Sequence, residues 1–108
     1  MRIHVLSLAA LVGIAIVAPA AFAQQPDKAK AAAAGKTLHE KDCTACHAKR
    51  FDGDPARIYL RPDRRVNTPA QLRAQVAFCN SQLGAGLFPE DEEHIALYLD
   101  LTYYKFAP

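Results

Sequence analysis

The stretch Gly35-Lys36-Thr37-Leu38-His39-Glu40-Lys41-Asp42-Cys43-Thr44-Ala45-Cys46-His47 decides the fold of this 108-residue chain. Strong helix formers fill residues 31–42, so we expect a helix there that runs directly into the cysteine pair. The two thiols lie three positions apart, on a helical turn, and an imidazole follows at once. The rest of the sequence must decide which of the chemistries open to a Cys-x-x-Cys pair operates here.

Cys-x-x-Cys-His is the pattern of covalent haem attachment, in which each thiol adds to one haem vinyl group and the histidine becomes the proximal iron ligand. A Cys-x-x-Cys pair also serves thiol–disulfide exchange or half of a zinc site. The chain has only three cysteines, which excludes a four-cysteine zinc site, and no strand pattern precedes the motif. We therefore expect one covalent haem c on Cys43 and Cys46, with His47 on the iron. A thiol–disulfide enzyme is the alternative if no haem is attached.

The first 23 residues have the pattern of a cleaved signal peptide. Met1-Arg2 gives a positive start, Val5 to Val17 is an apolar run, and Ala21-Phe22-Ala23 is a small-residue cleavage site. The run is shorter than the ~20 apolar residues of a membrane span. We expect residues 1–23 to be removed and the mature protein to lie in the periplasm, where c-type haem is attached, without a membrane span.

Residues 24–108 are then one small domain, the expected cytochrome c domain, with little surface to bury in a core of its own. A covalently bound haem would supply much of the missing apolar interior. Removal of Arg2 with the signal peptide lowers the net charge from +2 to +1. This charge and its distribution indicate neither nucleic-acid binding nor attachment to a membrane surface.

The pattern of start and stop signals predicts an all-α domain. Thr68-Pro69-Ala70-Gln71 is a capping box with proline at the first helical position, and Gly84 is a typical helix end. The remaining expected helices are bounded by similar cap and proline signals. The expected helices are 31–42, a short one that begins at Asp54-Pro55 and stops before Pro62, one from Thr68 to about Leu83, and one from about Pro89 to Lys105.

Two segments of the chain resemble the first and last helices of class I cytochromes c. They are Gly35–His47 and Ile95-Ala96-Leu97-Tyr98-Leu99. The resemblance implies a class I cytochrome c-like fold around one covalent haem, in which the two helices cross at Gly35. At the position of His39 the family usually has an aromatic residue, so we expect His39 to pack or hydrogen-bond at the crossing.

The second axial ligand of the iron departs from the family. Class I cytochromes c normally use methionine, and the only methionine here is Met1. Cys79 is the best candidate, because it shares one face of a helix with Leu72, Val76 and Leu83. An unpaired thiol in an exported protein also requires an explanation. The chain further resembles a subgroup of small monohaem cytochromes, some of which use His/Cys ligation, including a nitric-oxide-binding pair of subunits.

Other assignments of the second axial ligand, at the sixth coordination position of the iron, remain open. Cys79 can simply be a small buried hydrophobic residue, as free cysteines often are. The position can also be vacant, or taken by His94, although His94 lies beside the expected inward stripe of the last helix rather than on it. That stripe consists of Ile95, Tyr98, Leu99 and Thr102.

Several arginines lie close together after the motif, and haem propionates need cationic partners. Charge-assisted bonds to the propionates are expected from at least one of them. The remaining arginines can form a docking patch for an acidic redox partner, or a solvated loop. The candidates are Arg57, Arg61, Arg64 and Arg65.

These residues predict a non-catalytic haem protein, since no constellation of acid, base and nucleophile is present. The first hypothesis is an electron carrier of low potential with His47/Cys79 ligation, serving a redox partner protein as a monomer, homodimer or heterodimer. The second is an NO- or CO-binding haem protein, or a sensor subunit that docks on a redox enzyme. It follows from the weak hold of ferrous iron on a thiolate, which would let Cys79 leave on reduction.

Overall fold

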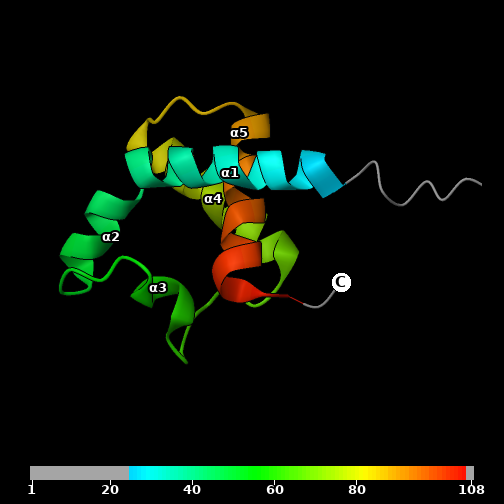
Figure 1. The fold of residues 1–108 in the computed structure, drawn as a ribbon. Coiled ribbons are helices and arrows are strands. Elements are labelled where there is room, and N and C mark those ends of the chain that lie inside the picture. The colour runs from blue at the N-terminus through cyan, green and yellow to red at the C-terminus, as the bar shows by residue number, and fades with distance from the viewer. Residues whose placement is uncertain (1–24, 107–108) are drawn as a thin grey trace, which may run out of the picture.

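The computed structural model describes residues 25–106, and every regular element among them is a helix (Figure 1). The expected all-α class is confirmed. The expected signal peptide, 1–23, lies outside the described residues. Among the described residues, no helix is long and apolar enough to cross a membrane.

Helices α1 (Gln25–Asp42) and α2 (Thr44–Arg50) follow one another with only Cys43 between them. α1 begins at Gln25 rather than at Ala31, because a proline at position 26 and Asp27 suit the first turn of a helix. The Cys43 N–H donates to the His39 carbonyl oxygen at 3.0 Å, so the hydrogen bonding of α1 continues into the cysteine motif. The motif therefore extends from a long, regular helix.

Helix α3 (Arg57–Leu60) is a single turn that begins later than the Asp54-Pro55 signal predicts. The Asp54 carboxylate accepts a hydrogen bond from the Ala56 N–H at 3.0 Å, which stabilises a turn ahead of the helix. Arg61 is extended, as the residue before a proline prefers to be. α3 thus ends before Pro62, as predicted.

Helix α4 (Pro69–Leu83) has the bounds that the capping box predicts. Thr68 Oγ1 accepts a hydrogen bond from the Gln71 N–H at 3.2 Å, and Gln71 Oε1 accepts one from the Asn67 N–H at 2.8 Å. Gly84 ends the helix with a left-handed backbone, at a φ of 59°.

Helix α5 (Pro89–Leu99) continues into a π-helical turn, η2 (Asp100–Tyr104). Asp91 accepts a hydrogen bond from the Phe88 N–H at 3.1 Å at the start of α5. Lys105 closes η2 in the left-handed conformation, at a φ of 52°. A π-helical turn holds more residues than an α-helical one, so it changes which side chains after Leu99 face inward.

The centre of the fold is the crossing of α1 over α5, with α4 packed on α5 (Figure 1). A Cβ built on Gly35 would lie 2.8 Å from the Ile95 backbone nitrogen and closer still to the His94 carbonyl, so only glycine fits. This confirms the expected crossing. The buried hydrophobic residues are Tyr59, Leu72, Val76, Ile95, Ala96, Leu99 and Tyr104.

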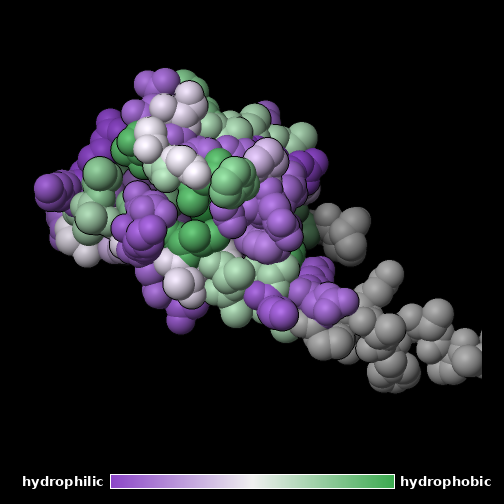
Figure 2. Space-filling view, turned by 90° about the horizontal axis from the view of Figure 1, so that it is seen from above, coloured by the Kyte–Doolittle hydropathy of each residue, from purple (hydrophilic) through white to green (hydrophobic). Residues whose placement is uncertain are grey.

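This core is small, and several large hydrophobic side chains reach the surface. Figure 2 shows hydrophobic patches between hydrophilic ones on the face seen from above. Leu83, expected on the inward face of α4, is 51% exposed because the last turn of the helix extends beyond the core. Thr102, expected on the inward stripe, is exposed, and Tyr104 is buried instead, because η2 shifts the register.

Candidate functional site

The three side chains of the motif lie at positions i, i+3 and i+4 around one helical turn, which brings Cys43, Cys46 and His47 to the same side. All cysteines of the chain are free thiols; Cys43 is half-buried and Cys46 is exposed. Burial, with smaller contributions from the neighbouring Asp42 and Cys79, raises the pKa of Cys43 to about 11.

His47 is held through one of its two ring nitrogens. Its Nδ1 lies 2.9 Å from the hydroxyl of Tyr59, and the two rings meet edge to face at 5.5 Å between centroids. This engagement leaves Nε2 as the nitrogen that can bind a metal. Burial lowers the pKa of His47, so the neutral, ligating form of the imidazole is favoured at neutral pH.

The Tyr59 hydroxyl has a second histidine partner. His39 Nε2 lies 2.7 Å from it, so one phenol links two imidazoles that come from different helices. Tyr59 is 5% exposed, and burial is the main cause of its raised pKa. Sequence reasoning missed Tyr59, because a tyrosine in a one-turn helix carries no local signal of its partners.

His39 lies at the helix crossing, as predicted. It is 3% exposed, and its ring centroid lies 5.5 Å from that of Tyr98 on α5. Burial, with a smaller contribution from the nearby His47, lowers the pKa of His39 to about 4, and Glu40 partly opposes the shift. His39 is therefore a neutral hydrogen-bonding partner at neutral pH and does not carry charge.

Cys79 lies on the face of α4 that also carries the buried Leu72 and Val76, and its own side chain is half-buried. Gln75 Nε2 donates a hydrogen bond to the sulfur at 3.3 Å. Burial contributes most to the raised pKa values of Cys43 and Tyr59, and a thiolate at Cys79 raises both further. The Cys79 sulfur is thus within electrostatic reach of the motif and of the tyrosine that holds His47.

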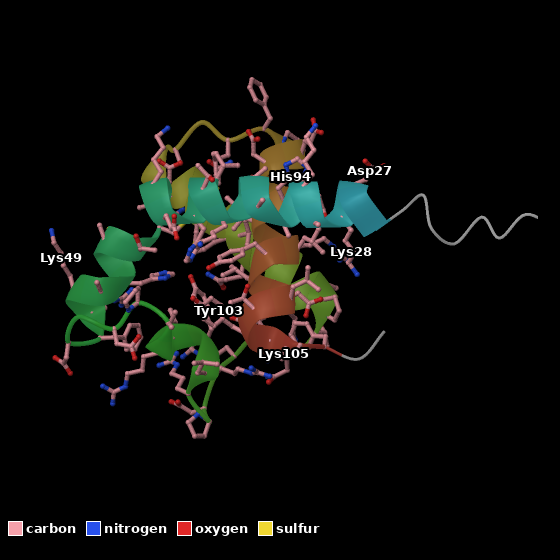
Figure 3. The ribbon with its side chains drawn as sticks, in the orientation of Figure 1. Asp27, Lys28, Lys49, His94, Tyr103 and Lys105 are labelled. Carbon is pink, nitrogen blue, oxygen red and sulfur yellow. The ribbon has the colours of Figure 1, made fainter. Side chains whose placement is uncertain are left out.

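His94 lies away from this arrangement, on the part of α5 that contacts α1 (Figure 3). Its Nε2 is 4.0 Å from Glu90 one turn earlier, and about a quarter of its side chain is exposed. His94 therefore has a partner on its own helix.

The candidate arginines do not form one cluster. Arg64 turns inward: its guanidinium lies 4.9 Å from the centre of the Tyr104 ring and donates to the Tyr59 carbonyl oxygen at 3.1 Å. Arg57 lies 3.6 Å from Asp52, and Arg65 is exposed.

Arg57 and Arg61 line an open groove of about 560 Å³ between the end of α2 and α3. Arg50 and the carboxylates of Asp54 and Asp63 line the same groove. Two of the predicted cationic side chains therefore face a common space there. Arg64 and Arg65 lie outside it.

The donor set fits a covalently bound haem better than a free metal ion. Among residues 25–106, no group of three or more histidine, cysteine or acidic side chains could hold an ion. The motif instead offers two free thiols, which could attach a haem, and one imidazole nitrogen, which could bind its iron. Comparison with known protein families, curated proteins and solved structures finds no match to this chain.

Proposed function

We propose that this chain is an exported c-type cytochrome that carries one covalent haem and transfers electrons at low potential in the periplasm. The observation that supports this most is the geometry of the motif. Cys43, Cys46 and His47 lie on one side of a helical turn, and Tyr59 holds His47 by Nδ1 so that Nε2 is left for iron. Its partner would be a redox protein.

Each side chain has a separate role in this proposal. Cys43 and Cys46 hold the cofactor covalently, and His47 is the proximal ligand. The haem, when bound, supplies the one-electron change between ferric and ferrous iron. Arg57 and Arg61 are the proposed partners of the propionates, because they face one groove, whereas Arg64 holds Tyr59 and Tyr104 in place.

The test is haem attachment in a host with the c-type maturation machinery. Denatured protein should keep its haem stain on a gel, and changing Cys43 and Cys46 together to alanine should abolish the stain. Cys79→Ala is the matched control, because it removes the third thiol and leaves the attachment pair intact. If acid–acetone extraction releases free haem from the parent, the proposal is wrong.

We further propose that Cys79 is the distal ligand, as a thiolate. It is the half-buried thiol on the inward face of α4, and the hydrogen bond from Gln75 Nε2 would stabilise negative charge on the sulfur. A thiolate donates electron density to the iron and favours the ferric state, which lowers the potential.

The ferric absorption spectrum tests this ligand. Cys79→Ser should replace a low-spin thiolate spectrum by a high-spin or water-bound one and raise the potential. Ala77→Ser is the matched control, since it adds a hydroxyl two residues away on the same helix. An unchanged ferric spectrum in Cys79→Ser would mean that His94 or an open position takes the place of the thiolate.

The parent and its Cys79→Ser variant also test the second candidate function, which is the binding of NO or CO. Cys79 favours this candidate, because a thiolate that leaves ferrous iron opens a coordination position. The reduced parent should then bind CO, and reduced Cys79→Ser should bind it faster. If the reduced parent stays six-coordinate and binds neither gas, electron transfer remains the single proposed function.

A further inference from the structure

We propose that Tyr59, oriented by His39, is the positioning residue that fixes the tautomer and the ring orientation of His47 as an iron ligand. The inference deepens the proposed function and rests on it. It is carried by the two short contacts of the Tyr59 hydroxyl, 2.9 Å to His47 Nδ1 and 2.7 Å to His39 Nε2.

The protons in this chain of hydrogen bonds can be counted. A phenol has one proton to donate, and each neutral imidazole has one N–H and one lone pair. Between two imidazoles, the hydroxyl must therefore donate to one and accept from the other. The hydrogen bonds can therefore run in only two directions, either from His47 through Tyr59 to His39 or the reverse. Each direction fixes the tautomers of both histidines.

Binding of iron by His47 selects one direction. A ligating Nε2 needs its lone pair, so the proton of His47 must be on Nδ1, from which it is donated to the Tyr59 oxygen. The Tyr59 hydroxyl then donates to His39 Nε2, and His39 carries its own proton on Nδ1. In the opposite direction Tyr59 donates to His47, whose Nε2 is protonated and cannot bind iron.

The hydrogen bond also acts on the iron through the ligand. An acceptor at Nδ1 increases the basicity of a ligating imidazole, and a more basic ligand favours ferric over ferrous iron. Tyr59 is a better acceptor when its own proton is donated to His39, because hydrogen bonds in a chain polarise one another. Both residues should thus lower the potential, and loss of either should raise it.

The experiment compares covalently haem-loaded variants by midpoint potential and by the ferric electron paramagnetic resonance spectrum, which reports the orientation of the imidazole. Tyr59→Phe removes the hydroxyl and keeps the ring. Tyr103→Phe is the matched control: its ring stacks on Tyr59 at 5.1 Å, and it lies on η2 (Figure 3), but it makes no hydrogen bond to His47. We expect Tyr59→Phe to raise the potential and change the spectrum, and Tyr103→Phe to match the parent.

Two variants of His39 keep the test valid if Tyr59→Phe does not fold. His39→Phe leaves Tyr59 without its acceptor and should raise the potential, and His39→Gln, whose amide oxygen can accept the Tyr59 proton, should restore it. Parent-like potential and spectrum in Tyr59→Phe, or in both His39 variants, would overturn the inference. A parent without covalent haem would instead overturn the proposed function, and the gel stain reveals that before any variant is compared.

Discussion

Replacing Gly35 by valine tests the packing that positions the whole site. At this residue α1 lies against the backbone of α5, and any Cβ would be closer than 3.0 Å to atoms of His94 and Ile95. These are backbone atoms, so they cannot move aside as the end of a flexible side chain would. Relief of the overlap therefore requires the two helices to separate.

The cost of that separation follows from the side chains buried at the crossing. A gap of 0.5–1 Å forfeits about a quarter to a half of the dispersion energy between the surfaces it separates. For Ile95 and Leu99, which are 1% and 3% exposed, this amounts to roughly 1 kcal/mol each at ~0.15 kcal/mol per atom pair. The better helix propensity of valine returns less than about 0.5 kcal/mol. We expect Gly35→Val to lose about 2 kcal/mol, within the range of about 1–3 kcal/mol usual for overpacking.

The assay is unfolding by urea, followed by circular dichroism at 222 nm, on the haem-loaded protein. Ala33→Val is the matched control, because it puts the same side chain on an exposed position of α1 and should change the stability by less than about 0.7 kcal/mol. If Gly35→Val is as stable as the parent, then the two helices do not cross at this residue, and the argument from close backbone contact is wrong.

Further predictions concern single hydrogen bonds and one buried imidazole. Asn80→Ala should cost about 1–3 kcal/mol, because the side chain bonds both the N–H and the carbonyl of Leu87 and also Glu92; exposed Gln82→Ala, measured beside it in urea, should stay within about 0.5 kcal/mol of the parent. Thr68→Ala should cost about 1 kcal/mol by removing the cap of α4, and an equal midpoint would speak against the bond to Gln71. His39 has a pKa of about 4 in the folded protein against 6.5 when unfolded, so the unfolded chain takes up its proton first as the pH falls. The stability that His39 contributes is thus fully present above pH 6.5 and declines by as much as about 3 kcal/mol on the way to pH 4. His39→Phe should flatten this part of the pH profile, and an equally steep decline in that variant would assign it to other groups.

The all-α fold class and most helix ends could be predicted from the sequence, because the interactions that determine them are local. The Thr68 cap, the Gly84 terminus and the stop before Pro62 each depend on atoms a few residues away, so the pattern of residues is sufficient. The Gly35 crossing was also predictable, through the resemblance of the flanking helices to class I cytochromes c. The exposed Thr102 was not, since a π-helical turn after Leu99 depends on how the C-terminal aromatic residues pack.

The same division holds within the candidate site. The sequence by itself determined that Cys43, Cys46 and His47 share one side of a helical turn, because spacing alone places them there. Only the tertiary structure decided what holds His47. Tyr59 is 12 residues from His47 and 20 from His39, and their hydrogen bonds exist only because α3 packs against η2, the continuation of α5, and so brings Tyr59 to the two histidines. Contacts between residues so far apart depend on the packing of whole helices, which no local pattern encodes.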